Sequence, residues 1–312
     1  MMTDTAPPDL IALARQAAFL LLQGQAGQAA RLCEQMREID PNLEQFVAFI
    51  DLLIWARPRD RLYPLIRDLV DAGFACPPSF DLLAAAAIWA GNSEAARALT
   101  DPDRFLSIAP LHGPDDPDLP LLVHELASGL EHYEQPADRS IRSGWRRNHL
   151  ERADSPVLRR MFDRLWQAGL EYIGQLSTAP DNPFLRSRPP GLTLRAWSVV
   201  SGADTHHLSH IHATSWINGV YYVEVPPVVG DRVGKPGWLR VGPAANRGFT
   251  AALGWDERWI RPEPGLVVLM PSHFSHETVP LGCDERRICV AFELHAATAD
   301  EADYRFPLTG SQ

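Results

Sequence analysis

Three histidines within six positions are the residues of this sequence best suited to chemistry. His207, His210 and His212 lie in the stretch HLSHIHATSWINGVYYVEV, which continues into a β-rich run with two adjacent tyrosines. Side chains two positions apart in an extended strand point to the same side, so the rings of His210 and His212 share a face. Neutral imidazoles on one face are typical ligands of a first-row transition metal. For such a pair taken alone, the alternative is a histidine-rich polar loop.

A second motif supplies a third imidazole. The segment PEPGLVVLMPSHFSHETVP reads as an apolar strand, Leu266 to Met270, followed by a Pro-Ser turn and then His276. A β-barrel folded back on itself would bring His276 opposite the first pair. The two motifs together therefore favour a metal site over a polar loop.

The chain around these motifs predicts an all-β domain. After Pro189-Pro190, the segment Leu192 to Val200 alternates and is rich in β-forming residues, and short strands separated by glycine and proline follow as far as Leu294. Strands at this spacing indicate a sandwich or a barrel. The double-stranded β-helix, a jelly-roll relative of the cupins, commonly carries inward-facing histidines at its mouth.

The last predicted strand carries an arginine that strand alternation places inside. Arg287, Cys289 and Ala291 share one face of this strand, and Arg286 faces outward. Burying a guanidinium is costly unless an anion meets it. A guanidinium grips a carboxylate with two charge-assisted hydrogen bonds, so Arg287 predicts a carboxylate ligand inside the barrel.

The composition excludes several classes of protein. The net charge of −10 argues against general binding to nucleic acid or to a membrane surface. The N-terminus, MMTDTAPPDL, lacks the basic and apolar regions of a signal peptide, and no apolar run approaches the ~18–20 residues that span a bilayer. The four cysteines form no CxxC pair, which favours reduced, mostly buried thiols in a cytoplasmic protein.

The range 1–110 is predicted to be a helical repeat domain. Apolar residues recur at helical spacing from Asp9 to Gln23, and a second helix is expected from Asn42, which would serve as its N-cap. Ala29-Ala30-Arg31 recurs as Ala95-Ala96-Arg97, 66 residues later and close to twice the ~33-residue period of a tetratricopeptide unit. Such arrays present a concave surface to a peptide; the alternative is a helical cap that only shields the second domain.

Two further ranges complete the predicted organisation. The range 111–185 is predicted to hold a linker and supporting helices, with the Pro- and Asp-rich segment 101–118 leading into it. The range 186–312 is predicted to be the double-stranded β-helix. The fold class is therefore α+β, with a tetratricopeptide-like helical domain followed by a jelly-roll, cupin-like domain.

The motifs resemble a known family. The runs HIHATSWINGVYYVEVP, PEPGLVVLMPSHFSHETVP and ERRICVAFEL are similar to the 2-oxoglutarate and iron(II)-dependent oxygenases that often follow tetratricopeptide repeats in bacteria. The resemblance implies His210, His212 and His276 as iron ligands. It implies Arg287 and Tyr222 as residues that hold the distal carboxylate of 2-oxoglutarate, and O2 as the second co-substrate. The metal centre itself would do the catalysis.

The chain departs from the family and its wider superfamily at two places. The segment QPADRSIRSG resembles the family, but Arg146-Arg147-Asn148 replaces the Thr-Gln-Thr that follows it there. His212 stands where the superfamily commonly has a carboxylate, and three neutral imidazoles would leave an iron(II) site at net +2 rather than +1. Asp204, Glu224 and Glu293 are the nearest carboxylates that would compete for the ligand position.

The resemblance implies an iron(II)- and 2-oxoglutarate-dependent dioxygenase that hydroxylates a peptide or protein side chain, or a small molecule. A peptide or protein substrate would bind the N-terminal helical repeats. Three alternatives stay open. The first is a three-histidine cupin-type dioxygenase that uses no 2-oxoglutarate, against which Arg287 argues. In the second, His212 is not a ligand and water completes the shell. The third is a non-catalytic tetratricopeptide adaptor with a vestigial barrel.

Overall fold

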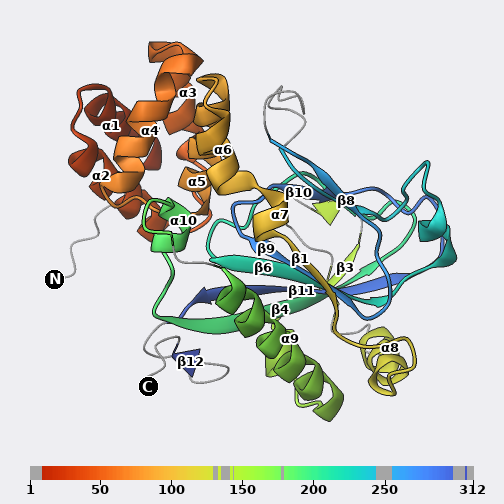
Figure 1. Ribbon diagram of the computed structural model, residues 1–312. Helices are drawn as coiled ribbons and strands as arrows, with labels where there is room; N and C mark the ends of the chain where they lie inside the picture. The colour runs from red at the N-terminus through yellow and green to blue at the C-terminus, as the bar shows by residue number, and fades with distance from the viewer. Residues whose placement is uncertain are drawn as a thin grey trace.

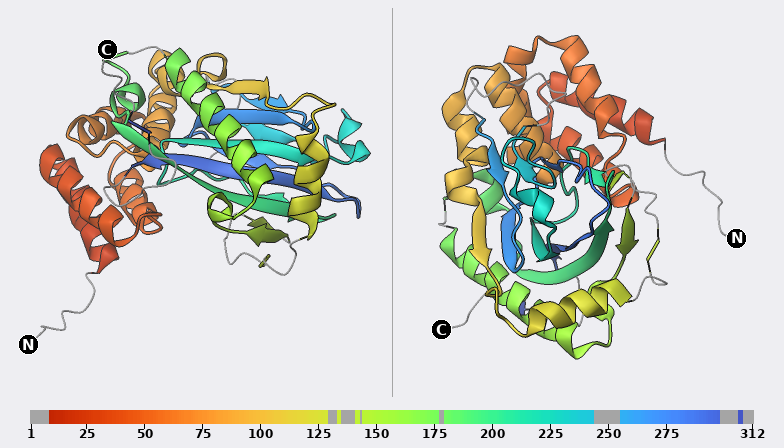
Figure 2. Two further views of the ribbon diagram at one scale, coloured as in Figure 1. Left: turned by 90° about the horizontal axis from the view of Figure 1, so that it is seen from below. Right: turned by 90° about the vertical axis from the view of Figure 1, so that its right-hand side faces the viewer.

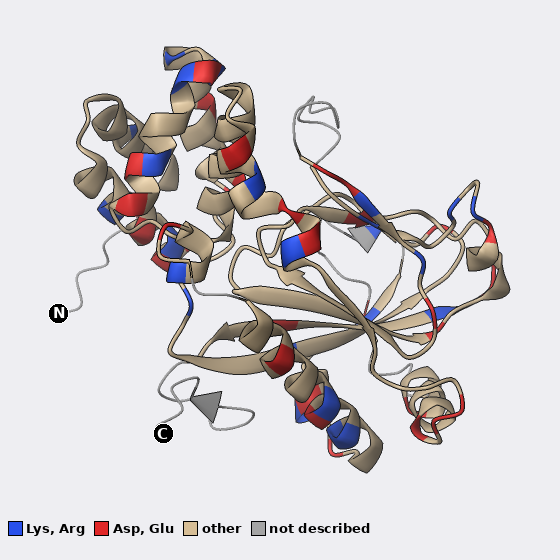
Figure 3. Ribbon diagram, in the orientation of Figure 1, with Lys and Arg blue, Asp and Glu red and all other residues tan. Residues whose placement is uncertain are grey.

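The protein joins an N-terminal helical region to a region of antiparallel β-sheets, which makes it an α+β fold (Figure 1). The computed structural model describes residues 9–128, 133–134, 141–142, 144–176, 179–243, 255–297 and 306–307. No helix in these ranges is both long and apolar enough to cross a membrane. Charged residues lie mainly on the helices and loops, whereas the strands of the main sheet are largely uncharged (Figure 3).

Short helices that pack side by side make up the N-terminal region. They are α1 (Leu10–Leu22), α2 (Ala26–Ile39), α3 (Phe46–Ala56), η1 (Arg59–Arg61), α4 (Leu62–Asp71), α5 (Pro77–Trp89), α6 (Ser93–Thr100) and α7 (Pro102–Phe105). α1 begins where predicted, because the Asp9 carboxylate accepts hydrogen bonds from the N–H groups of Ile11 and Ala12.

The second predicted helix begins later than expected. α3 begins at Phe46, and the prediction of Asn42 as its N-cap is wrong. The Asp40 carboxylate accepts hydrogen bonds from the N–H groups of Asn42 (3.1 Å) and Glu44 (2.7 Å). Leu43 has a left-handed φ of 52°, which is incompatible with a continuous right-handed helix.

The strands and the helices between them form the rest of the molecule. The strands are β1 (Ser107–Pro110), β2 (Ile141–Arg142), β3 (Trp145–Arg147), β4 (Gly191–Ser201), β5 (His206–His207), β6 (Ile217–Glu224), β7 (Leu239–Val241), β8 (Arg258–Ile260), β9 (Leu266–Pro271), β10 (His276–Thr278), β11 (Arg287–Ala296) and β12 (Phe306–Pro307). The helices are α8 (Asp118–Ser128), η3 (Leu150–Arg152), α9 (Pro156–Gln175), α10 (Pro183–Arg186) and η4 (Pro227–Gly230).

The main sheet has the strand order β1-β9-β6-β11-β4-β12, and β3 pairs with β4. A smaller sheet has the order β10-β7-β8, and β2 pairs with β5. All of these pairs are antiparallel. The sheet curves, and α8 and α9 lie across its outer face (Figure 2). The apolar segments predicted as strands around Leu192, Leu266 and Arg287 are β4, β9 and β11.

Three short strands lie outside the range predicted for the β domain. β1, inside the range 1–110 predicted to be helical, pairs with β9, with Ser107 opposite Leu269. β2 and β3 lie inside the range 111–185 predicted to be linker and supporting helices; β2 pairs with β5, and β3 pairs with β4. Strands of two to four residues carry too little alternation to be recognised from sequence.

The helical region and the sheets share one hydrophobic core. Every residue of α5 from Pro78 to Ile88 is buried. The Phe80 ring packs against Phe184 (6.1 Å between centroids) and against His273 (5.5 Å). The helices are thus fixed against the sheets rather than tethered by a free linker.

Candidate metal and co-substrate site

The fold brings the two histidine motifs together through their backbones. His210 and His276 form an isolated antiparallel bridge, with N–H···O distances of 3.1 and 3.0 Å. The His212 N–H donates to the Ser272 carbonyl oxygen (3.0 Å). The backbone pairing therefore fixes His276 opposite the pair, as the sequence predicts.

The three imidazoles are arranged to present the same nitrogen. Ring centroids lie 4.4 Å apart for His210 and His276, 5.3 Å for His210 and His212, and 5.1 Å for His212 and His276. One ligand atom from each ring lies within 4.8 Å of the others. His210 Nδ1 donates to the Leu208 carbonyl oxygen (2.7 Å), and His276 Nδ1 donates to the Phe274 carbonyl oxygen (3.0 Å). Their Nε2 atoms are therefore the ones that would bind a metal.

The surroundings keep His276 neutral and therefore able to bind a metal. Burial lowers the pKa of His276 well below its ordinary value, and the neighbouring His210 and His212 rings lower it further. Metal ligation requires neutral imidazole, so a low pKa removes proton competition near neutral pH. Three imidazole nitrogens are a donor set that iron, zinc, copper or nickel accepts.

Glu293 lies next to His212 and is hydrogen-bonded to it. His212 Nδ1 donates to Glu293 Oε1 (2.5 Å), and His295 Nε2 donates to Glu293 Oε2 (2.8 Å). Burial opposes ionisation of Glu293, but the hydrogen bonds from His212 and His295 outweigh it and hold the pKa of the carboxyl well below its usual range. Glu293 is therefore an anion that contacts the histidine cluster through its hydrogen bond with His212.

The other two carboxylates considered from the sequence do not join the cluster. Glu224 pairs with Arg286 (2.5 Å), and the group of potential ligands around His210 contains neither Glu224 nor Asp204. Glu293, the third of these carboxylates, lies one hydrogen bond from His212.

Arg287 is buried, on the face of β11 where strand alternation places it. A cavity of about 60 Å³ runs from the three histidines to the Arg287 side chain, which is 1% exposed. Tyr222, Cys289 and Ala291 line the same cavity. Arg286, the neighbour of Arg287, points outward to Glu224.

The guanidinium of Arg287 has no carboxylate partner among the described residues. Nη1 donates to the Gly237 carbonyl oxygen (2.8 Å), Nη2 donates to Ser201 Oγ (3.4 Å), and Nε has no partner. A buried cation with an unsatisfied donor suits an anionic ligand, and the two carboxylates of 2-oxoglutarate fit this requirement. Burial raises the pKa of Tyr222, so its hydroxyl stays neutral and able to donate a hydrogen bond.

Gly237 lies against the guanidinium of Arg287. Its φ of +71° is one that side-chain-bearing residues rarely adopt. A Cβ at this position would lie 2.8 Å from Leu281 Cδ2 and 3.4 Å from Arg287 Nη1. The glycine thus allows its backbone carbonyl to approach the guanidinium.

A larger cleft of about 990 Å³ opens over the histidines. One wall comes from the residues before and within α3, together with Pro78 and Asp81 of α5. The other wall comes from the range 207–214, and from Trp197 and Arg146. The Arg146 guanidinium lies 4.5 Å from the centre of the Trp197 ring, and Trp197 stacks near His212 at 6.0 Å.

The sequence analysis did not predict the contact of Glu293 with His212 or the helical wall of the cleft. The alternation that places Arg287 and Ala291 inside also places Glu293 inside, so a signal for Glu293 was present. The helical wall depends on tertiary packing and has no local signal. Most of the segment 135–144, which resembles the family, lies outside the described residues.

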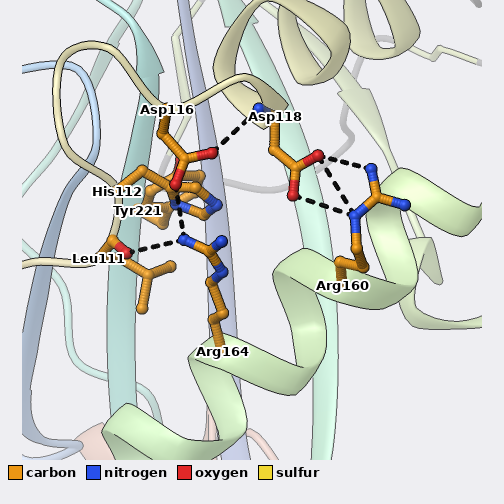
Figure 4. A network of polar contacts seen from close by, with 7 residues as sticks. All are labelled: Leu111, His112, Asp116, Asp118, Arg160, Arg164 and Tyr221. Carbon is orange, nitrogen blue, oxygen red and sulfur yellow. Dashed lines mark hydrogen bonds and ion pairs between the residues drawn. The ribbon is translucent and has the colours of Figure 1, made fainter.

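A second histidine–carboxylate cluster lies away from this site, at the junction of α8, α9 and β6 (Figure 4). The cluster consists of His112, Asp116 and Asp118, whose potential ligand atoms are close enough together to bind a metal. Both carboxylates, however, already have arginine partners. Arg160 Nη2 contacts Asp118 Oδ1 (2.5 Å), and Arg164 Nη1 contacts Asp116 Oδ2 (2.8 Å). Because the two guanidinium groups neutralise both carboxylates, we interpret this cluster as structural.

Comparison with known proteins assigns the C-terminal part. Residues 195–293 match the family model described as "Putative 2OG-Fe(II) oxygenase". We therefore assign the C-terminal part of the chain to this family. The matched range contains the three histidines, Tyr222 and Arg287. No curated protein sequence matches the chain.

Solved structures of similar proteins are distant. A prolyl-4-hydroxylase from Pseudomonas putida is 15% identical with a TM-score of 0.44, over 64% of this chain and 96% of that one. HygX from Streptomyces hygroscopicus, solved with nickel, 2-oxoglutarate and hygromycin B, is 14% identical with a TM-score of 0.43, over 62% of this chain and 84% of that one. TM-scores below 0.5 are too low to establish a common fold.

Proposed function

We propose that this protein is an iron(II)- and 2-oxoglutarate-dependent dioxygenase that hydroxylates its substrate. One observation carries the proposal. The cavity that begins at His210, His212 and His276 contains, buried within it, the guanidinium of Arg287 with an unsatisfied Nε. A three-histidine dioxygenase without 2-oxoglutarate would have no use for this cation, and an adaptor would have no use for either feature.

Each group in the cavity has a defined task in this proposal. The Nε2 atoms of His210, His212 and His276 would hold iron(II), which supplies O2 activation coupled to decarboxylation of 2-oxoglutarate. Arg287 would pair with the distal carboxylate, and the Tyr222 hydroxyl would donate to it. The overall reaction converts 2-oxoglutarate, O2 and a C–H bond into succinate, CO2 and an alcohol.

The order of the strands and helices supports a double-stranded β-helix preceded by tetratricopeptide-like repeats. In a double-stranded β-helix, the long strands β9-β6-β11-β4 would form one sheet and β10-β7-β8 part of the facing one. For the helices, Ala29-Ala30-Arg31 lies near the start of α2, and Ala95-Ala96-Arg97 lies near the start of α6. This equivalence supports a tetratricopeptide-like array.

A peptide or protein side chain is the proposed substrate, with a small molecule as the alternative. The cleft above the histidines is about 990 Å³ and is lined on one side by Phe46, Val47 and Ile50. Val47 is 60% exposed, and α3, the helix that carries it, has Asp51 as its only charged residue. An open cleft with an apolar wall that continues onto an exposed helix suits a polypeptide better than an enclosed small molecule.

Formation of succinate from 2-oxoglutarate tests the proposal. Protein loaded with iron(II) should form succinate in air, slowly without substrate, and His276→Ala should abolish this turnover. His206→Ala is the matched control, because His206 lies on β5 outside the cluster. O2 consumption that needs no 2-oxoglutarate would favour the three-histidine dioxygenase, and no turnover with any metal would favour the adaptor.

A further inference from the structure

We propose that Glu293 is a positioning residue of the metal site and supplies the negative charge that a three-histidine ligand set lacks. The inference rests on the metal site of the proposed function and deepens it. It assigns to a residue on β11 the electrostatic task that a coordinated carboxylate otherwise performs. It also gives a reason why this site can use His212 as a ligand.

Hydrogen bonds on both oxygens fix the carboxylate in place. Oε1 accepts from His212 Nδ1 at 2.5 Å, and Oε2 accepts from His295 Nε2 at 2.8 Å. The Glu293 side chain is 13% exposed and that of His295 is 8% exposed. With both acceptors occupied and little room to rotate, Glu293 holds the His212 ring in a single orientation.

The hydrogen bond also determines which nitrogen His212 presents. A proton held on Nδ1 by an anionic acceptor leaves Nε2 as the only lone pair of the ring. A carboxylate acceptor makes that lone pair more basic than a carbonyl acceptor does. His210 and His276 have carbonyl acceptors, from Leu208 and Phe274, so His212 is the electron-rich member of the three.

The charge of the site follows from this arrangement. A divalent metal with three neutral imidazoles carries net +2, and the Glu293 anion brings the local charge to +1. That is the charge of a site with two histidines and one coordinated carboxylate. Since the carboxylate is buried, its effect on the metal is screened much less than that of a surface charge.

Metal affinity of the purified full-length protein tests the assignment. We compare wild type, Glu293→Gln and Glu277→Gln by anaerobic calorimetry with iron(II), and by absorption spectroscopy with cobalt(II). Glu277 is the matched control because it adjoins His276 but pairs with Arg240 (3.1 Å), outside the group of potential ligands. Glu293→Gln should weaken metal binding about 10–100-fold and alter the cobalt spectrum, whereas Glu277→Gln should do neither.

A double variant separates charge from general damage. In His212→Asp alone, the new carboxylate faces Glu293, and the repulsion should weaken metal binding. In His212→Asp/Glu293→Gln, one anion remains and metal affinity should recover toward wild type. Recovery with a retained cooperative thermal transition supports the inference. Equal metal affinity of wild type and Glu293→Gln would overturn it and leave the proposed function intact, whereas absence of metal binding by wild type would overturn both.

Discussion

His273 Nε2 donates a hydrogen bond to the carbonyl oxygen of Leu99 (2.9 Å), across 174 positions of sequence. The bond joins the turn after β9 to the end of α6. The His273 side chain is 1% exposed and packs against Phe80 and Phe184. A histidine of the β region is therefore part of the core that holds the helices in place.

This contact predicts that stability depends on pH. Burial lowers the pKa of His273 from 6.5 to about 4, so the unfolded chain binds more protons than the folded one between these values. The contribution of His273 is complete above about pH 6.5, falls as the pH drops toward 4, and amounts to about 3 kcal/mol at most. Denaturant unfolding of wild type and His273→Gln across this range measures it.

His273→Gln keeps a donor for Leu99 but cannot titrate. We expect the free energy of unfolding of this variant to fall less steeply between pH 6.5 and 4 than that of wild type. Other groups titrate equally in both proteins, so the difference between the two curves isolates His273. Parallel curves would show that His273 does not remain neutral in the fold.

The shared core also predicts the behaviour of a shortened protein. A chain that begins at Leu119 lacks β1, whose pairing with β9 includes Ser107 opposite Leu269. It also lacks α5, which covers Phe184 and His273. We expect this fragment to aggregate or to unfold without a cooperative transition, because an edge of β9 and a buried apolar surface become exposed.

A chain that begins at Asp101 is the control for that fragment, since it keeps β1 and lacks only the helices before α7. It should aggregate less than the chain that begins at Leu119. Its free energy of unfolding should be lower than that of the full protein. A fragment from Leu119 that unfolds cooperatively and binds iron would show that the helices are dispensable for the fold. They would then serve recognition alone.

The neighbouring arginines at the start of β11, Arg286 just before the strand and Arg287 as its first residue, give the clearest prediction about the co-substrate. Arg287→Ala should weaken 2-oxoglutarate binding by about 2–5 kcal/mol, at least roughly 30-fold, because a buried ion pair loses one partner. Arg286→Ala should leave it unchanged, since Arg286 forms a surface pair with Glu224 that contributes about 0–1 kcal/mol to stability. Calorimetry on metal-loaded protein measures both affinities. Weaker binding by Arg286→Ala, with Arg287→Ala unaffected, would contradict the strand register.

Sequence periodicity was sufficient for the part of the site that lies on the long strand β11. The two-residue period placed Arg287, the first residue of β11, inside and Arg286, just before it, outside. The strand expected at His210 and His212 is absent: His210 forms an isolated bridge with His276, and the centroids of the His210 and His212 rings nonetheless lie 5.3 Å apart. The same period places Glu293 on the inner face with Arg287, but it does not reveal the partner of the carboxylate. Its actual contact with His212 depends on side-chain direction across 81 positions of sequence.

Other parts of the structure carry no local signal. β1 is four residues long, too short for alternation to distinguish it from a linker. Asn42 lies in a sequence typical of an N-cap, but the left-handed Leu43 delays α3 to Phe46. The wall that α3 and α5 contribute to the cleft results from packing of the helices against the sheets, which no pattern within either region specifies.

One titration tests the central claim most directly. Protein loaded with iron(II) under anaerobic conditions is titrated with 2-oxoglutarate, and the visible absorption is recorded. The three histidines and Arg287 together predict a charge-transfer band that saturates at one equivalent, is absent in His276→Ala and needs much more 2-oxoglutarate in Arg287→Ala. A wild-type protein that binds iron(II) but shows no band at any 2-oxoglutarate concentration would contradict the account.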